Sequence, residues 1–233
     1  MSEAQKGIIL FDLDDTILDF RTAERSAIKT TFEEMGIDSS DDTLRRYSEI
    51  NMSCWHKLEK GEMTRGEVLI SRFEMLFAEM GVEQSACDAQ HRYEQLLGGG
   101  HYFVPGAPEL LEELDEKYDL YIISNGVAAT QAKRIESAGI AKYFKDIFIS
   151  ELIGFNKPSR EFFEVCFSRI PGFARPRALI VGDSLSADIK GGSNAQVATC
   201  WLNMYGEEPG EIRPDHTIRS LSELPALVEK IFA

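Results

Sequence analysis

The chain has 233 residues, of which 39 are acidic and 25 are basic, so its formal net charge is −14. This excess argues against a nucleic-acid polymer or an anionic membrane as partner, because both are bound first through Lys and Arg. Hydrophobic residues make up 43% of the chain, a share typical of folded globular proteins. The 4 cysteines form no CxxC pair, which predicts reduced thiols rather than a zinc site or disulfides. With a polar start and no long apolar run, we expect a cytoplasmic protein without a signal peptide or membrane span.

Short apolar segments along the chain have the composition of buried strands. They span residues 7–11, 119–123, 146–149, 178–181 and 197–202. Helical patterns lie between them, at residues 108–117, 128–138, 159–169 and 186–195. Strands that alternate with helices predict a parallel sheet covered on both faces, a doubly wound, Rossmann-like α/β fold. In such sheets ligands bind at the carboxyl ends of the strands.

Residues 20–100 contain no convincing strand and read as four helices. Three of these cover residues 21–35, 42–60 and 85–97, and the other starts at a capping box formed by Thr64 and Glu67. We therefore predict a helical domain over residues 19–101, inserted into a core made of residues 1–18 and 102–233. Glycines at 98–100 and the Pro105-Gly106 pair are the predicted return hinge.

Acidic residues gather where two of the predicted strands end. Asp12 and Asp14 follow the first strand, and Asp183 and Asp188 follow the strand at 178–181. Carboxylates held close together repel unless one is protonated or a cation lies between them. Oxygen ligands of this kind suit Mg²⁺. Each pair could instead cap a helix or form an acidic loop, but their shared sheet edge favours a metal site.

Two further polar groups are expected at the same edge. Ser124, Asn125 and Gly126 follow a strand and precede a helix, so the hydroxyl and amides can bind an anion. Lys157 stands just before Pro158 in a loop. Together, acidic metal ligands, an anion cradle and one cation suit phosphoryl transfer, in which the protein positions the group and neutralises developing charge.

These motifs resemble those of the haloacid dehalogenase-like hydrolase superfamily. Four motifs occur in the expected order: Asp12-Leu-Asp14-Asp15-Thr16, Ser124-Asn125-Gly126, Lys157-Pro158, and Gly182-Asp183 to Asp188. The helical insertion resembles the small cap of the superfamily's first cap class. The true dehalogenases of the superfamily lack an acid at the position of Asp14, so its presence favours a phosphatase.

The resemblance implies a role for each matching residue. Asp12 would attack phosphorus to form an aspartyl-phosphate, and Asp14 would act as general acid and then general base. Mg²⁺ would be held by the Asp12 carboxylate, the Asp14 carbonyl and Asp183. Asp188 would lie in the outer shell of the metal or orient Lys157. Ser124 and the amides of Asn125 and Gly126 would bind the phosphoryl oxygens, while Lys157 would offset charge on the nucleophile and the phosphate.

Shorter segments resemble the bacterial pyrimidine 5′-nucleotidases, which act on dUMP, dTMP and related nucleotides. These segments are Leu18-Asp19-Phe20, Gly61 to Arg65, Arg72-Phe73-Glu74 and Ala198 to Asn203. We therefore expect an Mg²⁺-dependent phosphomonoesterase acting on a small-molecule phosphate ester, as a monomer or small homo-oligomer. A sugar-phosphate or phosphoglycolate phosphatase, a phosphosugar mutase and a non-catalytic phosphate-binding protein are the alternatives.

Candidate specificity residues cluster on the second helix of the insertion. They are Asn51, Trp55, His56 and Lys57. An aromatic ring beside polar groups can stack on a base and hydrogen-bond its edge. The alternative is that Trp55 belongs to the helical core and His56 is solvated.

Overall fold

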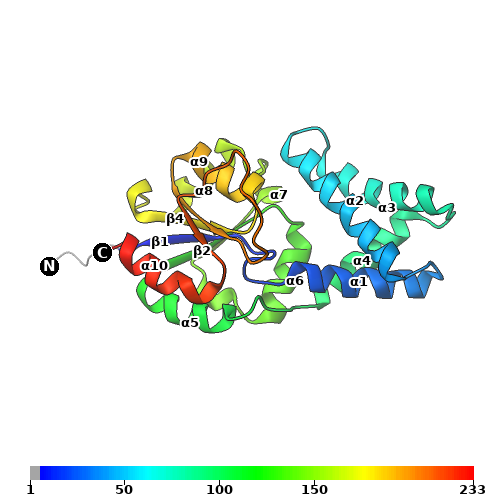
Figure 1. Cartoon of the computed structure of the whole chain (residues 1–233), viewed down its shortest axis with the longest axis horizontal. Helices are drawn as coiled ribbons and strands as arrows, with labels where there is room; N and C mark the ends of the chain where they lie inside the picture. Colours follow the sequence, from blue (N-terminus) through cyan, green and yellow to red (C-terminus); the bar gives the residue numbers. More distant parts are fainter. Residues whose placement is uncertain (1–5) are drawn as a thin grey trace. The chain divides into compact units, whose positions relative to one another are not determined.

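The computed structural model describes residues 6–233, which form two compact units (Figure 1). We call the first the core unit; it comprises the described residues up to Asp19 together with Tyr102–Ala128 and Ala138–Ala233. The second, the helical unit, comprises Phe20–His101 and Ala129–Ser137.

The core unit is built on a six-stranded sheet in the order β3-β2-β1-β4-β5-β6, with every pair parallel. The strands are β1 (Ile8–Phe11), β2 (Asp119–Ser124), β3 (Asp146–Ile149), β4 (Ala178–Gly182), β5 (Ala198–Leu202) and β6 (His216–Ile218). The predicted doubly wound α/β fold is confirmed. Five of the strands were predicted; β6 was missed because its 3 residues include a polar histidine and threonine and give no apolar run.

Helices cover both faces of this sheet. They are α5 (Ala107–Lys117), α7 (Ser150–Ile153), α8 (Arg160–Arg169), α9 (Lys190–Ala195) and α10 (Leu224–Ile231), with short turns η1 (Ala141–Tyr143), η2 (Arg175–Arg177), η3 (Leu185–Ile189) and η4 (Leu221–Glu223). The helix α6 (Ala128–Ala138) follows β2 in the chain, and its residues Ala129–Ser137 belong to the helical unit. Figure 1 shows α8 and α9 on one face and α5 and α10 on the other. Phe162 and Phe163 of α8 pack in one buried cluster with Ile8 and Leu10 of β1. Because both faces are covered, β1 is apolar at every position.

The chain departs from the expected helix at residues 186–195. Residues Leu185–Ile189 form the π-helical turn η3, and the α-helix α9 begins only at Lys190. The Ser184 hydroxyl starts the turn by accepting the Ala187 amide. A wide turn of this kind shifts side-chain directions relative to an α-helix, and here Asp188 is fully buried.

Four helices of the helical unit pack around an aromatic core. They are α1 (Phe20–Met35), α2 (Asp41–Glu59), α3 (Arg65–Met80) and α4 (Ala86–Gly99). The predicted capping box of Thr64 and Glu67 begins α3. The rings of Tyr47, Phe73 and Tyr93, from three different helices, lie within 5.9 Å of one another between centroids.

One segment is grouped differently in the structure than in the prediction. We predicted the core to include all of residues 102–233, but Ala129–Ser137 of α6 group with the helical unit. The reason is local packing: the Arg134 guanidinium lies 5.6 Å from the Phe20 ring centroid, and the His101 ring hydrogen-bonds the Ser137 hydroxyl at 3.1 Å.

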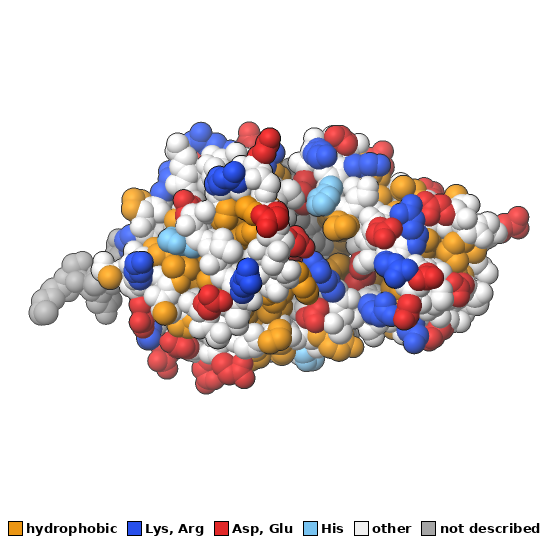
Figure 2. Space-filling view, viewed as in Figure 1, with side chains coloured by type: hydrophobic (Ala, Val, Ile, Leu, Met, Phe, Trp, Pro, Cys, Tyr) orange, Lys and Arg blue, Asp and Glu red, His pale blue; other side chains and the backbone are white. Residues whose placement is uncertain are grey.

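Charged side chains of both signs are mixed on the surface of the helical unit. Figure 2 shows Lys and Arg beside Asp and Glu over α1–α4 on the face drawn. Exposed pairs such as Arg46 with Glu79 and Arg92 with Glu34 account for part of this pattern. Within residues 6–233, none of the helices is long and apolar enough to cross a membrane.

Candidate active site

The end of β1 places Asp12 at the edge of the sheet. The Asp12 amide donates to the Val181 carbonyl at 2.9 Å, which continues the strand pairing one residue beyond Phe11. Asp15 then takes a left-handed backbone conformation, with φ of 58°, and its amide donates to the Leu18 carbonyl at 2.7 Å. The chain therefore turns directly after Asp14, which is half-buried, while Asp12 is buried.

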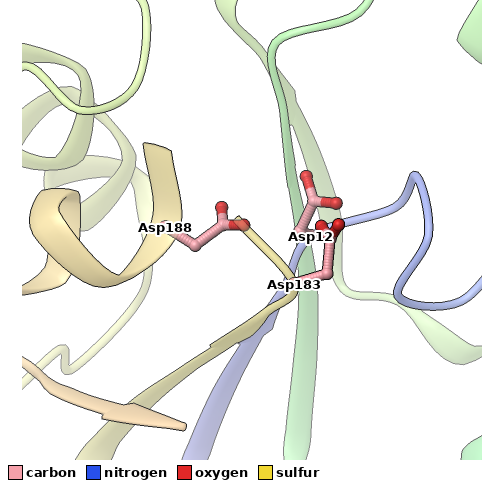
Figure 3. Close-up of side chains that lie close together, drawn as sticks. All are labelled: Asp12, Asp183 and Asp188. Atoms are coloured by element: carbon pink, nitrogen blue, oxygen red, sulfur yellow. The ribbon is translucent and has the colours of Figure 1, made fainter. Parts of the chain in front are cut away.

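Three carboxylates meet at this edge. Asp12 follows β1, Asp183 follows β4, and Asp188 comes from η3. One oxygen from each lies within 4.8 Å of the others. Figure 3 shows Asp12 and Asp183 side by side at the strand ends, with Asp188 directed toward them. The structure thus brings together three of the four acids that the sequence placed at this edge, and Asp14 is not part of the cluster.

Lys157 connects two of these acids. Its ammonium donates to Asp12 Oδ1 at 2.6 Å and to Asp188 Oδ1 at 2.7 Å. A third bond runs to the Ile123 carbonyl at 2.9 Å, so all three N–H donors of the lysine are used. The side chain is 2% exposed. Such a buried cation is held in one position, because each of its donors has a fixed acceptor.

Burial dominates the electrostatics of the cluster. It raises the pKa of Asp12 to about 8; Lys157 opposes this rise, and Asp188 and Asp14 add to it. Burial also raises the pKa of Asp183 well above its ordinary value, with Asp12 and Asp188 adding to the effect. For Lys157, burial lowers the pKa, but the two carboxylates outweigh burial and raise it. The site therefore concentrates more negative charge than one ammonium can offset.

The anion cradle predicted at Ser124, Asn125 and Gly126 lies at the end of β2. Ser124 is buried, and its hydroxyl oxygen accepts the Gly126 amide at 3.0 Å. The Asn125 side chain is turned to the Lys157 backbone, accepting the amide and donating to the carbonyl, both at 2.9 Å. The sequence did not predict this second role for Asn125.

Gly182 allows Asp188 to approach the sheet. A methyl group at position 182 would lie 2.2 Å from Asp188 Oδ2, far inside van der Waals contact. The same oxygen accepts the Ser184 amide at 3.1 Å. Asp188 is thus fixed by Lys157 on one oxygen and by the Ser184 amide on the other.

Two further residues touch the site elements without having been predicted. Glu151 of α7 accepts the Ala128 amide at the start of α6, at 2.6 Å. Trp201 of β5 donates its indole N–H to the Asp183 carbonyl at 2.8 Å. Trp201 stood in a segment used for the resemblance, but no sequence pattern indicated what its ring contacts.

The four candidate specificity residues lie on α2 of the helical unit and differ in exposure. Asn51 is buried; its amide donates to Glu24 at 2.6 Å and accepts from Arg72 at 2.7 Å. Trp55 is half-buried and packs on the helical core, His56 is exposed and Lys57 is half-buried. The contacts of Asn51 favour a structural role inside this unit.

The chain is similar to known proteins over most of its length. The chain matches the model of the family described as haloacid dehalogenase-like hydrolase over residues 9–202. It is 45% identical over 218 residues to the HAD-hydrolase YfnB of Bacillus subtilis, covering 93% of this chain and 92% of that protein. The magnesium-bound crystal structure of YfnB superposes with a TM-score of 0.92 at 42% identity, covering 97% of this chain and 100% of the other.

Two relatives carry the name of the predicted branch. The pyrimidine 5′-nucleotidase PynA of Streptococcus pneumoniae is 35% identical over 224 residues, covering 95% of this chain and 94% of PynA. The pyrimidine 5′-nucleotidase YjjG of Escherichia coli is 31% identical over 223 residues, with 95% and 97% covered. Both resemblances seen in the sequence are confirmed, and the chain belongs to the haloacid dehalogenase-like hydrolase family.

Proposed function

We propose that this chain is an Mg²⁺-dependent phosphomonoester hydrolase that forms an aspartyl-phosphate on Asp12 and acts on pyrimidine nucleoside 5′-monophosphates. The observation that carries the proposal is the buried bridge from Asp12 through Lys157 to Asp188. It holds one carboxylate at the sheet edge beside the anion cradle of β2, which suits a nucleophile that must meet a phosphoryl group in a fixed orientation.

The donor set suits Mg²⁺. Asp12 is buried and Asp183 is half-buried, both present carboxylate oxygens, and desolvation raises the pKa of both groups. A hard divalent cation prefers such oxygens and would relieve the excess negative charge. Asp12, Asp183 and the Asp14 carbonyl would hold it, while Asp188 is engaged by Lys157 and Ser184. When bound, the cation would supply charge neutralisation for the transferred phosphoryl group.

The chain's own residues supply the remaining chemistry in two steps. In the first, an Asp12 oxygen forms a bond to phosphorus, the bond from phosphorus to the ester oxygen breaks, and Asp14 gives that oxygen its proton. In the second, Asp14 takes a proton from water as the water oxygen bonds to phosphorus, and the bond to Asp12 breaks. Inorganic phosphate leaves, and both carboxyl groups return to their starting protonation.

Lys157, Ser124 and the neighbouring amides act on charge and position throughout. The Lys157 ammonium orients the attacking carboxylate and offsets charge that develops on the phosphoryl oxygens. Ser124 and the amides of Asn125 and Gly126 would bind those oxygens. The pyrimidine preference is supported by the names of PynA and YjjG, and Trp55, His56 and Lys57 are the proposed contacts of the nucleoside part.

Phosphate release from a panel of esters tests the proposal. The panel contains dUMP, dTMP, UMP, AMP, glucose phosphates and phosphoglycolate, each with and without Mg²⁺, and Asp12→Asn serves as the contamination control. We expect Mg²⁺-dependent release led by the pyrimidine nucleotides. Another ester in the lead would discard the nucleotide assignment and keep the chemistry. No Mg²⁺-dependent release from any ester would contradict the proposed chemistry.

A burst experiment separates the two carboxyl roles. p-Nitrophenol is a good leaving group and needs little general acid, so Asp14→Asn should still release p-nitrophenolate once and then stall at the aspartyl-phosphate. We expect a burst that approaches one equivalent per chain for Asp14→Asn and none for Asp12→Asn. Wild-type steady-state turnover by Asp14→Asn would show that Asp14 is not the general base.

A further inference from the structure

The Asp183 carbonyl lies beyond the regular pairing of its strand. In the register of the sheet, β4 pairs with β5 from Leu179 opposite Ala198 to Gly182 opposite Trp201. Asp183 is the next residue, so its position is not fixed by the ladder. Its carbonyl accepts the indole N–H of Trp201 at 2.8 Å, and Trp201 as a residue is buried.

The backbone before Asp183 is intrinsically permissive. Gly182 must lack a side chain because Asp188 Oδ2 occupies the space that a methyl group would need. A glycine imposes few steric limits on its own torsions, so the residue that follows it can rotate more freely than after a residue with a side chain. Two contacts limit that freedom at the peptide between Asp183 and Ser184: its carbonyl accepts the Trp201 indole N–H, and its amide donates to Asp188 Oδ2.

We propose that Trp201 is a positioning residue for the cation ligand Asp183. The indole N–H holds the Asp183 peptide in one orientation, and the carboxylate is thereby held toward Asp12 within the acidic cluster. Trp201 touches neither the substrate nor the cation in this proposal. It acts as the outer partners of metal ligands do, by fixing the direction of a ligand before the metal arrives.

Direct Mg²⁺ binding is the readout, measured by isothermal titration calorimetry on the full chain. Replacing Trp201 by 3-benzothienylalanine keeps the ring shape but puts sulfur in place of the N–H, and Trp201→Phe removes both donor and volume. We expect Mg²⁺ affinity to fall about tenfold in the benzothienylalanine variant, the lower end of effects seen on removing outer partners of metal ligands. Its melting temperature should stay close to that of the wild type.

Cys200→Ala is the matched control. Cys200 precedes Trp201 on β5 and is fully buried, and its side chain points to the opposite face of the sheet because successive strand residues alternate. This variant loses core packing without touching the Asp183 carbonyl, so its Mg²⁺ affinity should equal that of the wild type. If it loses as much affinity as the benzothienylalanine variant, the proposal is wrong.

Steady-state kinetics give a second way to separate weaker Mg²⁺ binding from impaired catalysis. The Mg²⁺ concentration for half-maximal phosphate release should rise in the benzothienylalanine variant, while kcat at saturating Mg²⁺ should return to near the wild-type value. An unchanged Mg²⁺ affinity in that variant would overturn the proposal, whatever Trp201→Phe does to folding.

The inference rests on the proposed function for the identity of the cation, and the two can fail separately. Wild-type protein that releases phosphate, with a benzothienylalanine variant that binds Mg²⁺ normally, overturns the role of Trp201 alone. Mg²⁺ binding without phosphate release from any ester contradicts the proposed function, and the calorimetric comparison still decides the role of Trp201. Wild-type protein that binds no Mg²⁺ overturns both.

Discussion

Asn125 and Lys157 are joined by two reciprocal hydrogen bonds, although they lie 32 residues apart in the chain. The Asn125 carboxamide accepts the Lys157 amide and donates to the Lys157 carbonyl, as a strand neighbour would. The loop after β2 therefore sets the backbone position of the residue whose ammonium holds Asp12. One pair of contacts therefore links the proposed anion cradle to the lysine that holds the proposed nucleophile.

Asn125→Ala should lower kcat by about a hundredfold. Both bonds are lost, the Lys157 backbone can shift, and a misplacement of about 1 Å at a reacting group costs on this order. Asn194→Ala is the control, because the exposed Asn194 makes a single bond to the Pro158 carbonyl in the same loop. Steady-state kinetics on both variants measure the difference. Equal losses would show that loop stability in general, and not the Asn125 contact, matters.

Gly182→Ala should impair activity strongly without unfolding the sheet. The new methyl group would meet Asp188 Oδ2, so Asp188 must move away from Lys157, and the orientation of the ammonium is lost. Gly66→Ala is the control, since a methyl group there meets nothing within 4 Å. We expect normal turnover from Gly66→Ala and a loss of at least about tenfold in kcat from Gly182→Ala. Wild-type turnover by Gly182→Ala would show that the position of Asp188 does not matter for catalysis.

Stabilisation by Mg²⁺ should grow with pH. The pKa of Asp12 is raised from 3.8 to about 8 in the folded chain, and that of Asp183 is also raised. These acids bind protons more tightly when folded, so they stabilise the metal-free protein fully below pH 3.8 and lose that contribution as the pH rises toward about 8. Mg²⁺ needs the deprotonated forms and competes with the protons.

Thermal melting with and without a fixed Mg²⁺ concentration measures this competition. We expect the increase in Tm caused by Mg²⁺ to be larger near pH 8 than near pH 6. Asp183→Asn removes one titrating ligand and should reduce the increase at both pH values. An Mg²⁺ effect that is the same across this range in the wild type would show that the carboxyls are already ionised without the cation.

Arg72→Met should destabilise the helical unit far more than a surface change of the same residue type. The buried Arg72 donates to Asn51 on α2 at 2.7 Å and to Gln90 on α4 at 2.6 Å, and Asn51 in turn donates to Glu24 on α1. Removing it takes the guanidinium donors away from the buried side-chain oxygens of Asn51 and Gln90, and each lost donor costs about 1–3 kcal/mol.

Arg46→Ala is the matched comparison for Arg72→Met. Arg46 pairs with Glu79 on the surface, where the two side chains are 47% and 43% exposed. Such a pair contributes less than about 1 kcal/mol. Urea unfolding followed by circular dichroism gives both free energies. If the two variants lose equal stability, the buried bonds do not tie the helices together as described.

The motifs at the strand ends could be predicted from sequence because each motif directly follows a predicted strand, and the carboxyl ends of parallel strands lie at one edge of the sheet. Asp12 and Asp183 follow strands that pair with each other, so the rule for parallel sheets was enough. The role of Trp201 could not be predicted, because it depends on where one side chain reaches across a strand pair. The burial of Asn51 could not be predicted for a similar reason, since its partners come from two other helices. The grouping of Ala129–Ser137 with the helical unit could not be predicted, because helical periodicity shows that a face is apolar but not which neighbour covers it.

The bridge between Leu18 and Phe103 has an evolutionary consequence. Together with the bond from the Asp19 amide to the Tyr102 carbonyl, it means that the chain leaves the core and returns at one point. An insertion anchored at neighbouring ends does not disturb the pairing of the strands around it. One set of helices could therefore be exchanged for another by recombination at this junction, with compensating changes in α6, and the carboxylates at the sheet edge would be inherited intact.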